Sequence, residues 1–419
     1  MAGEASRARK DWTVVGLVSY PHMFSHIFYL VLPPLFPLLK AEFDVSYAAL
    51  GLVITCFGVA AGLGQTPIGF VVDRFGARPV LIAGTILEAG AVGAIGFATE
   101  YWHLLVLYAL AGIGHTVYHP ADYAIMAAQV SKSRLGRAIG IHSFSGNVGF
   151  AIAPIFMVAV AELYDWRAAF IAIGLLGLAF VPVLVAQTQL LSNNAPSRKP
   201  EPAKPGAARA PASDTSARAG IALLLSAPIL MCFAFYVLQG MGFGALRTFL
   251  VAAMDALHGT PLAVSNTALS GLLAGAAAGI LVGGWLADRI GVRASVAVVT
   301  LSFAGAVVAL VGAVAMPALA FIVLLTLAGF TQGVFNPFRD LMVRQATPDG
   351  AMGKVMGFVS SGMNLAGGLT PLLFGWLMDI GEPRLVFYLA AVFVAIALVT
   401  FIGVRARVAP AAAPVSASA

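Results

Sequence analysis

The sequence alternates long apolar runs with short polar segments along almost its whole length. Most runs hold about 20 residues, the length that a helix needs to cross the hydrocarbon core of a bilayer. They lack the two-residue alternation of membrane β-barrel strands, so the backbone groups must be satisfied within helices. Because 60% of the residues are apolar and only 10% are charged, the pattern predicts an all-α membrane protein.

We expect about twelve transmembrane helices, each about 20 residues or longer. They lie near residues 12–38, 46–72, 79–97, 103–129, 134–163, 166–188, 221–254, 263–287, 293–314, 317–345, 352–378 and 385–404. A stretch rich in Pro, Ala and basic residues interrupts the pattern and lacks the apolar content to fold. The predicted parts are an N-terminal six-helix lobe (1–191), a flexible cytoplasmic linker (192–218), a C-terminal six-helix lobe (219–408) and a disordered tail (409–419).

The two halves repeat one sequence pattern. Residues 112–154 return as residues 329–371 without a gap, and GFVVDRFGAR from Gly69 returns as GWLADRIGVR from Gly284. In a membrane protein, such a repeat indicates two related helical bundles with a binding site between them near the middle of the bilayer.

Basic residues are concentrated on one side of this topology. If both termini lie on that side, it carries all but five of the 24 Lys and Arg residues. Cytoplasmic loops collect Lys and Arg, so both termini are predicted to be cytoplasmic in a multi-pass protein of the inner (plasma) membrane. The net charge of +6 is then a topology signal, and no nucleic-acid partner is expected.

The repeated loop places charges at the cytoplasmic ends of the second and eighth spans. Gly76 and Gly291 can each end a helix with a positive backbone angle. Asp73 and Asp288 then lie at the negative end of a helix dipole, where a carboxylate needs a nearby cation. The candidate cations are Arg74, Arg78, Arg289 and Arg293.

The loop pattern G-x-x-x-D-R-x-G-x-R resembles the loop signature of the major facilitator superfamily, and span number, central linker and orientation extend the resemblance over the whole chain. The resemblance implies an alternating-access transporter made of two six-helix repeats. It also implies that the loop charges form a cytoplasmic gate, made by Asp73, Arg74, Arg78, Asp288, Arg289 and Arg293. The alternative is that these charges only set the topology.

More narrowly, the fourth span resembles the fosmidomycin-resistance branch of that superfamily through Gly112, Gly114 and the His119-Pro120 pair. The first span adds a PLL-x-x-EF run that ends at Phe43. This resemblance implies a secondary active transporter that uses protons to export a small, anionic compound or drug.

Two departures leave the direction of transport open. Tyr108 occupies a position where many superfamily members carry arginine, and Met157 and Val158 replace the final glycines of the drug-antiporter motif in the fifth span. Proton-coupled uptake of an organic acid or sugar-like metabolite is therefore the alternative within transport. A membrane sensor or scaffold without transport is the alternative from another class.

Histidines are unusually frequent within the predicted spans of the first half. His22 and His26 share one helix face, as do His115 and His119, and His142 lies in the fifth span. Imidazole titrates near neutral pH, which suits proton coupling and the binding of anions. A transition-metal site is also conceivable, but no cysteine accompanies the histidines, so we expect no metal and no cofactor.

Three charged residues within spans carry the functional hypothesis. Asp122 and Arg339 occupy equivalent positions of the repeat and have opposite charge. We expect Asp122 and His119 to serve proton coupling. Arg339 and Arg247 can hold an anion, and Asp340 need not neutralise Arg339 because adjacent helical residues point in different directions. The predicted substrate-binding set is His22, His26, His115, His119, Arg247, Asn336 and Arg339.

Proline and glycine patterns suggest mechanical roles. Proline frees the carbonyl four residues earlier and allows a kink, so the predicted helix hinges are Pro120, Pro154, Pro337 and Pro371. Glycines spaced four residues apart between 275 and 283 predict close helix packing. Glu88 lies in the third span, and its partner cannot be identified from the sequence.

No enzyme signature and no ATP-binding loop occurs in the sequence, so neither catalysis nor ATP-driven transport is expected. The isolated cysteines, Cys56 and Cys232, are read as packing residues. The predicted partners are a small-molecule substrate, protons and the lipid bilayer, with the chain acting as a monomer.

Overall fold

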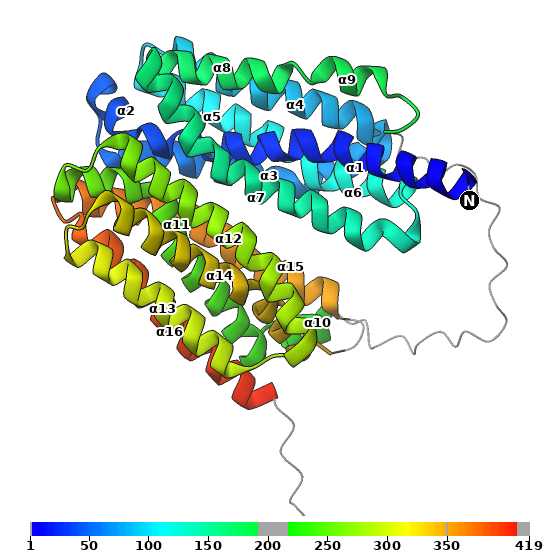
Figure 1. Cartoon of the computed structure of the whole chain (residues 1–419). Helices are drawn as coiled ribbons and strands as arrows, with labels where there is room; N and C mark the ends of the chain where they lie inside the picture. Colours follow the sequence, from blue (N-terminus) through cyan, green and yellow to red (C-terminus); the bar gives the residue numbers. More distant parts are fainter. Residues whose placement is uncertain (1, 192–216, 349–350, 409–419) are drawn as a thin grey trace, which may run out of the picture.

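The first half of the protein folds into an N-terminal lobe of helices. The computed structural model describes residues 2–191, 217–348 and 351–408, and these contain helices and no strand (Figure 1). The predicted tail and nearly all of the predicted linker lie outside this range. The N-terminal lobe contains α1 (Ala2–Tyr29), η1 (Pro33–Leu35), α2 (Phe36–Phe43), α3 (Tyr47–Phe75), α4 (Ala77–Ala94), η2 (Ile95–Phe97), α5 (Tyr101–His115), α6 (Tyr118–Gln129), α7 (Lys132–Leu163), α8 (Trp166–Leu178) and α9 (Val181–Ala186).

The second half forms a C-terminal lobe beside the first (Figure 1). It contains α10 (Ala217–Leu224), α11 (Ala227–His258), α12 (Leu262–Ile290), α13 (Ala294–Ala313), α14 (Ala318–Ala346), α15 (Met352–Asp379) and α16 (Arg384–Val408). Helices α11 to α16 correspond to the six spans predicted for this half.

Helix ends follow local sequence signals. The Ser46 hydroxyl and the Asp165 carboxylate each accept a hydrogen bond from the backbone N–H three residues on, at 3.0 Å and 2.6 Å, and so begin α3 and α8. Gly76 ends α3 with φ 91° and Gly291 ends α12 with φ 63°. The positive backbone angles predicted for these two glycines are therefore confirmed.

The predicted pair of six-helix repeats is confirmed. Within the described part of the chain, 10 helical segments are long and apolar enough to cross a bilayer. Two spans are not among them: the fourth is divided into α5 and α6, which are each too short, and the eleventh is α15, whose 28 residues include several Gly, Ser and Thr.

The fourth span breaks where α5 ends, at Thr116 and Val117. The Thr116 hydroxyl donates to the carbonyl of Ile113 at 2.7 Å, which satisfies one of the carbonyls freed there. Pro120 lies in the first turn of α6, where a missing N–H costs no helical hydrogen bond. The other predicted hinges, Pro154, Pro337 and Pro371, lie inside uninterrupted helices.

Buried apolar residues form one core shared by both lobes and two cores that each belong to a single lobe. The shared core includes Phe36 from α2 and Phe249 from α11, whose ring centroids lie 5.6 Å apart. The core around Val14 contains only N-terminal residues, and the core around Ile229 contains only C-terminal residues. The lobes therefore join at the end that carries α2, here called the closed end, and have separate cores at the end that carries the start of α1 and α10, here called the terminal end (Figure 1).

Backbone-directed hydrogen bonds also join the lobes at the closed end. The Asp379 carboxylate, at the end of α15, accepts from the backbone N–H groups of Tyr47 and Ala48 at 2.7 Å and 2.9 Å. One lobe thus supplies a negatively charged cap for the first turn of α3 in the other lobe. Asn266 adds a bond from α12 to the carbonyl of Pro34, at 3.3 Å.

Candidate functional site

Arg247 lies where the two lobes meet. It comes from α11, and its guanidinium contacts Tyr29 at the end of α1, with Nη2 donating to the Tyr29 hydroxyl at 3.5 Å. The guanidinium carbon also lies 4.9 Å from the Tyr29 ring centroid and 5.3 Å from that of Phe150 on α7. No carboxylate forms a salt bridge with it among the residues that the structure describes. Arg247 is therefore a cation at the lobe interface that contacts Tyr29 and Phe150 and has no carboxylate partner among the described residues.

A small cavity of ≈ 30 Å³ adjoins this arginine. Its lining brings together both lobes and includes Tyr29, Ile54, Gly240, Gly244, Arg247 and Gly367. Three of these lining residues are glycines, which have no side chain to fill the cavity. The cavity holds no more than a water-sized group in this arrangement, and a larger ligand requires the lobes to move apart.

Glu88 has a partner that the sequence could not identify. Its side chain is 0% exposed on α4, and Oε1 lies 2.9 Å from Nδ1 of His115, the last residue of α5. Gly114 permits this approach, since a Cβ there would lie 2.7 Å from the backbone nitrogen of Glu88. The second carboxylate oxygen has no hydrogen-bond partner within the described part of the chain. The structure thus forms a buried carboxylate–imidazole pair between the third and fourth spans.

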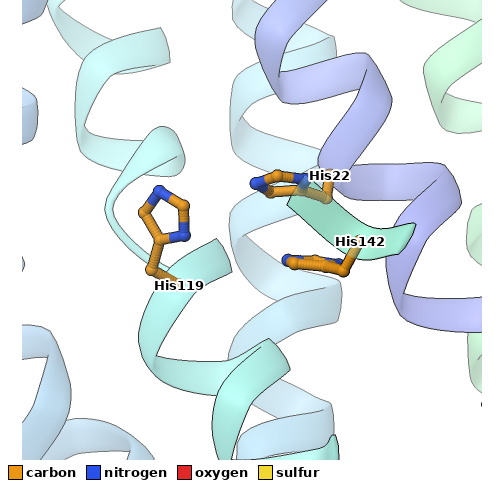
Figure 2. Close-up of side chains that lie close together, drawn as sticks. All are labelled: His22, His119 and His142. Carbon is orange, nitrogen blue, oxygen red and sulfur yellow. The ribbon is translucent and has the colours of Figure 1, made fainter. Parts of the chain in front are cut away.

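The remaining intramembrane histidines gather inside the N-terminal lobe. His22 on α1 stacks on His142 of α7, with ring centroids 3.8 Å apart, and His119 of α6 lies 5.2 Å from His22 (Figure 2). His26 lies 4.6 Å from His22. A Cβ at Gly146 would lie only 2.8 Å from the His26 ring, so this glycine of α7 makes room for the cluster.

Asp122 belongs to the same cluster. Its side chain is 0% exposed, and Oδ2 lies 3.5 Å from Nε2 of His142. Neither carboxylate oxygen has a hydrogen-bond partner among the described residues. The structure therefore brings Asp122 together with His142, a residue that the sequence did not include in the predicted site.

Arg339 has partners within its own lobe. Nε donates to Asp340 at 2.8 Å, and Nη1 donates to Oε1 of Gln239 on α11 at 3.1 Å. Tyr236 donates to the same Asp340 oxygen at 2.8 Å, and Gln239 donates to Asn336 at 3.3 Å. The expectation that Asp340 need not neutralise Arg339 is wrong. The long arginine side chain bends back toward its neighbour, although the two Cα–Cβ bonds diverge.

The structure does not join Asp122 to Arg339, since each has its ion-pair partner in its own lobe. It does bring His26, His115 and Arg247 around one set of aromatic rings. The His115 ring lies 6.1 Å from that of Tyr29, and the His26 ring lies 4.4 Å from that of Phe150. Their roles in substrate binding and proton coupling stay predictions.

The predicted gate charges lie at the terminal end and make no ion pair in the described parts of either lobe. Arg78 donates to the carbonyls of Leu184 and Val185 within its own lobe. Arg293 donates to Ile290 at 3.2 Å, while Arg74 and Arg289 lie over their neighbouring rings, Phe75 and Trp285. Asp73 and Asp288 are exposed. A latch between the lobes would form only if the terminal end closed, so the gate role stays a prediction.

Two further residues at the lobe interface were missed from the sequence. Tyr29 lies within an apolar run and carries no charge, so nothing marked it as a contact of Arg247. Asp379 lies at the end of a predicted span, where a carboxylate usually faces water. Only the packing of α15 against α3 shows that Asp379 caps a helix of the opposite lobe.

Comparison with known proteins agrees with this architecture. The sequence model of the protein family named Major Facilitator Superfamily matches residues 22–252 and 232–418. The bacterial homolog of the human lysosomal transporter Spinster has the same fold, with a TM-score of 0.78 at 15% identity over 95% of this chain and 97% of that chain. The nucleoside transporter NupG gives 0.75 at 14% identity over 93% and 99% of the two chains.

The curated relatives have names that refer to different functions. The fosmidomycin resistance protein of Escherichia coli is 24% identical over 163 residues, which are 39% of this chain and 40% of that protein. The membrane sensor protein UhpC of Salmonella typhimurium is 25% identical over 347 residues, 81% and 78% of the two chains. The probable sulfoacetate transporter SauU of Cupriavidus necator is 27% identical over 175 residues, 42% and 40% of the two chains.

The match to fosmidomycin resistance protein thus spans about two fifths of that relative. The family model, in contrast, extends over both lobes, and the described residues form the two six-helix repeats expected for it. The chain belongs to the Major Facilitator Superfamily and is a secondary transporter.

Proposed function

We propose that the protein moves a small organic anion across the inner membrane, coupled to protons, by alternating access. The observation that carries the proposal is Arg247, a cation at the lobe interface with no carboxylate partner among the described residues. A charge within a membrane span costs several kcal/mol unless it is compensated. Contacts with Tyr29 and Phe150 return about 0.5–2 kcal/mol each, which leaves an anion as the missing partner.

A guanidinium suits this task because its planar set of donors binds a carboxylate, phosphonate or sulfonate in two parallel hydrogen bonds. Two relatives have names that refer to small compounds, fosmidomycin and sulfoacetate. These compounds are reasonable first probes for this chain. Arg339 is a weaker candidate for the anion contact, because Asp340 already balances its charge at 2.8 Å.

The proton is assigned to buried carboxylate–imidazole pairs. Glu88 and His115 lie 2.9 Å apart, and the His115 ring faces Tyr29, which in turn contacts Arg247. Addition of a proton to the Glu88–His115 pair changes the net charge of that pair. Only the Tyr29 side chain lies between the pair and Arg247, the proposed anion contact. Asp122, with His119 and His142 nearby, is the second candidate and the one predicted from the sequence.

Export in exchange for protons is the direction that the resemblance to fosmidomycin resistance protein favours. The geometry supplies one observation for uptake with protons instead. A positive charge on the Glu88–His115 pair would stabilise an anion bound nearby at Arg247, so proton and anion would bind together. Similarity to UhpC over 81% of this chain supports the sensor alternative.

Transport then requires the two ends of the molecule to open in turn. At the closed end, opening breaks the bonds from Asp379 to α3 and separates the shared core. At the terminal end, closure brings the loops of Asp73 and Asp288 together as a gate. With both termini in the cytoplasm and a single chain as the working unit, the terminal end faces the cytoplasm.

Flux in proteoliposomes tests the proposal. Vesicles are loaded with fosmidomycin or sulfoacetate, and release is followed with an acidic or a neutral outside buffer. Acid outside should speed the release of loaded anion if the protein is an antiporter. The same gradient should instead speed the uptake of anion added outside if the protein is a symporter. No flux of any anion in either direction would instead support the sensor alternative.

Arg247→Ala is the decisive variant. Loss of a charge-assisted hydrogen bond costs about 1.5–3 kcal/mol, so anion flux should fall about 10-fold to 100-fold. The matched control is Arg167→Ala, which removes a surface arginine paired with Glu42 at 2.7 Å. Equal flux in the parent and the Arg247→Ala variant would show that Arg247 does not bind the substrate.

A further inference from the structure

The interior of the N-terminal lobe contains a group of buried polar atoms without hydrogen-bond partners. They belong to α1, α6 and α7: both ring nitrogens of His22, Nδ1 of His26, Nδ1 of His119, Nε2 of His142 and both carboxylate oxygens of Asp122. Groups of this kind are expensive to bury unless a ligand or water satisfies them. Their concentration in one place indicates that something binds there.

Three of these side chains have the arrangement of a metal-binding set. One ligand atom each from His22, His119 and His142 lies within 4.8 Å of the other two (Figure 2). The three rings come from three different helices and face one space. In a tetrahedral zinc site with metal–nitrogen bonds of about 2.1 Å, the ligand nitrogens are roughly 3.4 Å apart. Ligand atoms that lie up to 4.8 Å apart must therefore approach one another by up to about 1.4 Å when an ion binds.

The neighbouring polar groups identify the nitrogen that His142 would offer. Ser19 Oγ lies 3.4 Å from Nδ1 of His142. Nε2 remains free and lies 3.5 Å from Oδ2 of Asp122. A cation bound at Nε2 would therefore lie close to the Asp122 carboxylate, which supplies one negative charge in a fully buried position.

The donor set selects a class of ion. Imidazole nitrogens suit Zn²⁺, Co²⁺ and Ni²⁺, whereas Mg²⁺ and Ca²⁺ prefer oxygen ligands. Three imidazoles with one further ligand is a common arrangement for zinc. We infer that His22, His119 and His142 form a binding site for a divalent transition-metal ion, with Asp122 as a neighbouring negative charge and Zn²⁺ as the best fit.

This inference departs from the sequence-based expectation that no metal binds. The sequence did not place His142 with His22 and His119, and it is the approach of His142 to these two residues that completes a ligand set. A bound ion would fasten α6, which begins just after the break at Thr116 and Val117, to α1 and α7. The inference goes beyond anion transport and does not depend on it.

Metal binding by the purified full-length chain in detergent tests the site, with a purification tag that contains no histidines. Co²⁺ is titrated first, because a tetrahedral site gives intense visible absorption bands, and Zn²⁺ is then added to displace it. We expect one Co²⁺ per chain, displacement by Zn²⁺, and no displacement by Mg²⁺. Absence of the bands together with absence of Zn²⁺ binding by calorimetry would overturn the inference, with buried water left as the partner of the cluster.

Variants locate the binding within the cluster. His22→Gln, His119→Gln and His142→Gln should each weaken Zn²⁺ binding tenfold or more, and Asp122→Asn about 10-fold to 100-fold. The matched controls are His103→Gln, whose ring accepts a backbone N–H bond at 3.0 Å, and His258→Gln in the C-terminal lobe; both should bind Zn²⁺ as the parent does. Unchanged binding in the His22, His119 and His142 triple variant would assign the metal to other residues and refute the site.

Folding of each variant is checked by size-exclusion chromatography and circular dichroism. The Co²⁺ spectrum of the parent decides the question even if a variant fails to fold. Because the readout is binding at equilibrium, a negative result would leave the transport proposal untouched. Conversely, a failed flux assay would not alter the metal-binding result.

Discussion

The two lobes have the same repeat but treat the charged residues at equivalent positions in opposite ways. In the C-terminal lobe, Arg339 is balanced by Asp340 at 2.8 Å and bonded to Gln239 at 3.1 Å. In the N-terminal lobe, the equivalent residue Asp122 lies 3.5 Å from His142 and accepts no hydrogen bond at either carboxylate oxygen from the residues that the structure describes. The comparison indicates that the C-terminal network is structural, whereas the N-terminal cluster is kept for protons or a ligand.

The fourth and tenth spans show a similar contrast in the backbone. Both carry proline at the same repeat position, yet α5 and α6 are separated while α14 is continuous. Thr116 is at the break, and its equivalent in α14 is Gly333, which packs so closely that a Cβ would collide with the carbonyl of Ala276 on α12. Close packing against α12 accompanies a continuous α14, so proline alone does not decide where a helix breaks.

The contrast between the lobes predicts that the Glu88–His115 pair of the N-terminal lobe couples transport to protons. Glu88→Gln removes the ionisable carboxylate while keeping its shape, so flux driven by a pH gradient should fall about 100-fold, the lower end of the contribution of a general acid or base. Exchange of labelled for unlabelled substrate at equal pH should continue. Glu42→Gln, at a surface carboxylate, is the control for gradient-driven flux. If gradient-driven flux survives in Glu88→Gln, coupling does not use this pair.

A substitution in the Arg339–Asp340 network of the C-terminal lobe should instead lower the stability of the protein. Asp340→Ala leaves Arg339 without its counter-ion and Tyr236 without its acceptor. Because the Asp340 side chain is 49% exposed, water screens part of this loss, and the expected cost is about 1–2 kcal/mol in the free energy of unfolding. The melting temperature in detergent measures this loss. Asp122→Asn changes a carboxylate that accepts no hydrogen bond from the described residues, so it should lower the melting temperature much less. Equal losses for the two variants would erase the distinction between the lobes.

Helix packing gives a third test. Gly333→Ala forces a methyl group against the α12 backbone, and overpacking of this kind costs about 2 kcal/mol in unfolding free energy. The control is Gly284→Ala on α12, because a Cβ at Gly284 meets nothing within 4 Å. The melting temperature should fall only for Gly333→Ala. A similar result for both variants would mean that α12 and α14 are not packed tightly in the membrane.

The smallest effect is expected at the closed end. Asp379→Asn weakens two hydrogen bonds to α3 and removes the charge that stabilises its first turn, so the closed arrangement should become about tenfold less populated. Alkylation of a single cysteine introduced at Thr55, which bonds to the carbonyl of Gly368 in the opposite lobe, measures the opening. Glu382→Gln nearby is the control. An unchanged alkylation rate would show that apolar packing alone holds this end closed.

The four-residue glycine spacing in α12 illustrates what could be read from the chain. It predicts close packing, and the structure confirms it, because a Cβ at Gly275 or Gly279 would collide with a carbonyl of α14. The partner of Glu88 could not be predicted, since His115 is 27 residues away along the chain and on another helix. Arg339 shows the limit of local rules, because a flexible side chain reached the neighbour from which its helix position pointed it away.

The sequence by itself determined the spans, the two-lobed repeat and the glycine helix ends, because these depend on the length of apolar runs and on local backbone conformation. Only the tertiary structure decided which polar groups meet. It placed His142 beside His22 and Asp122 beside His142, left Arg247 between the lobes without a carboxylate among the described residues, and used Asp379 to cap the opposite lobe. Such pairings depend on how helices pack and on small residues such as Gly114 and Gly146 that let them approach, so spacing along one helix cannot reveal them.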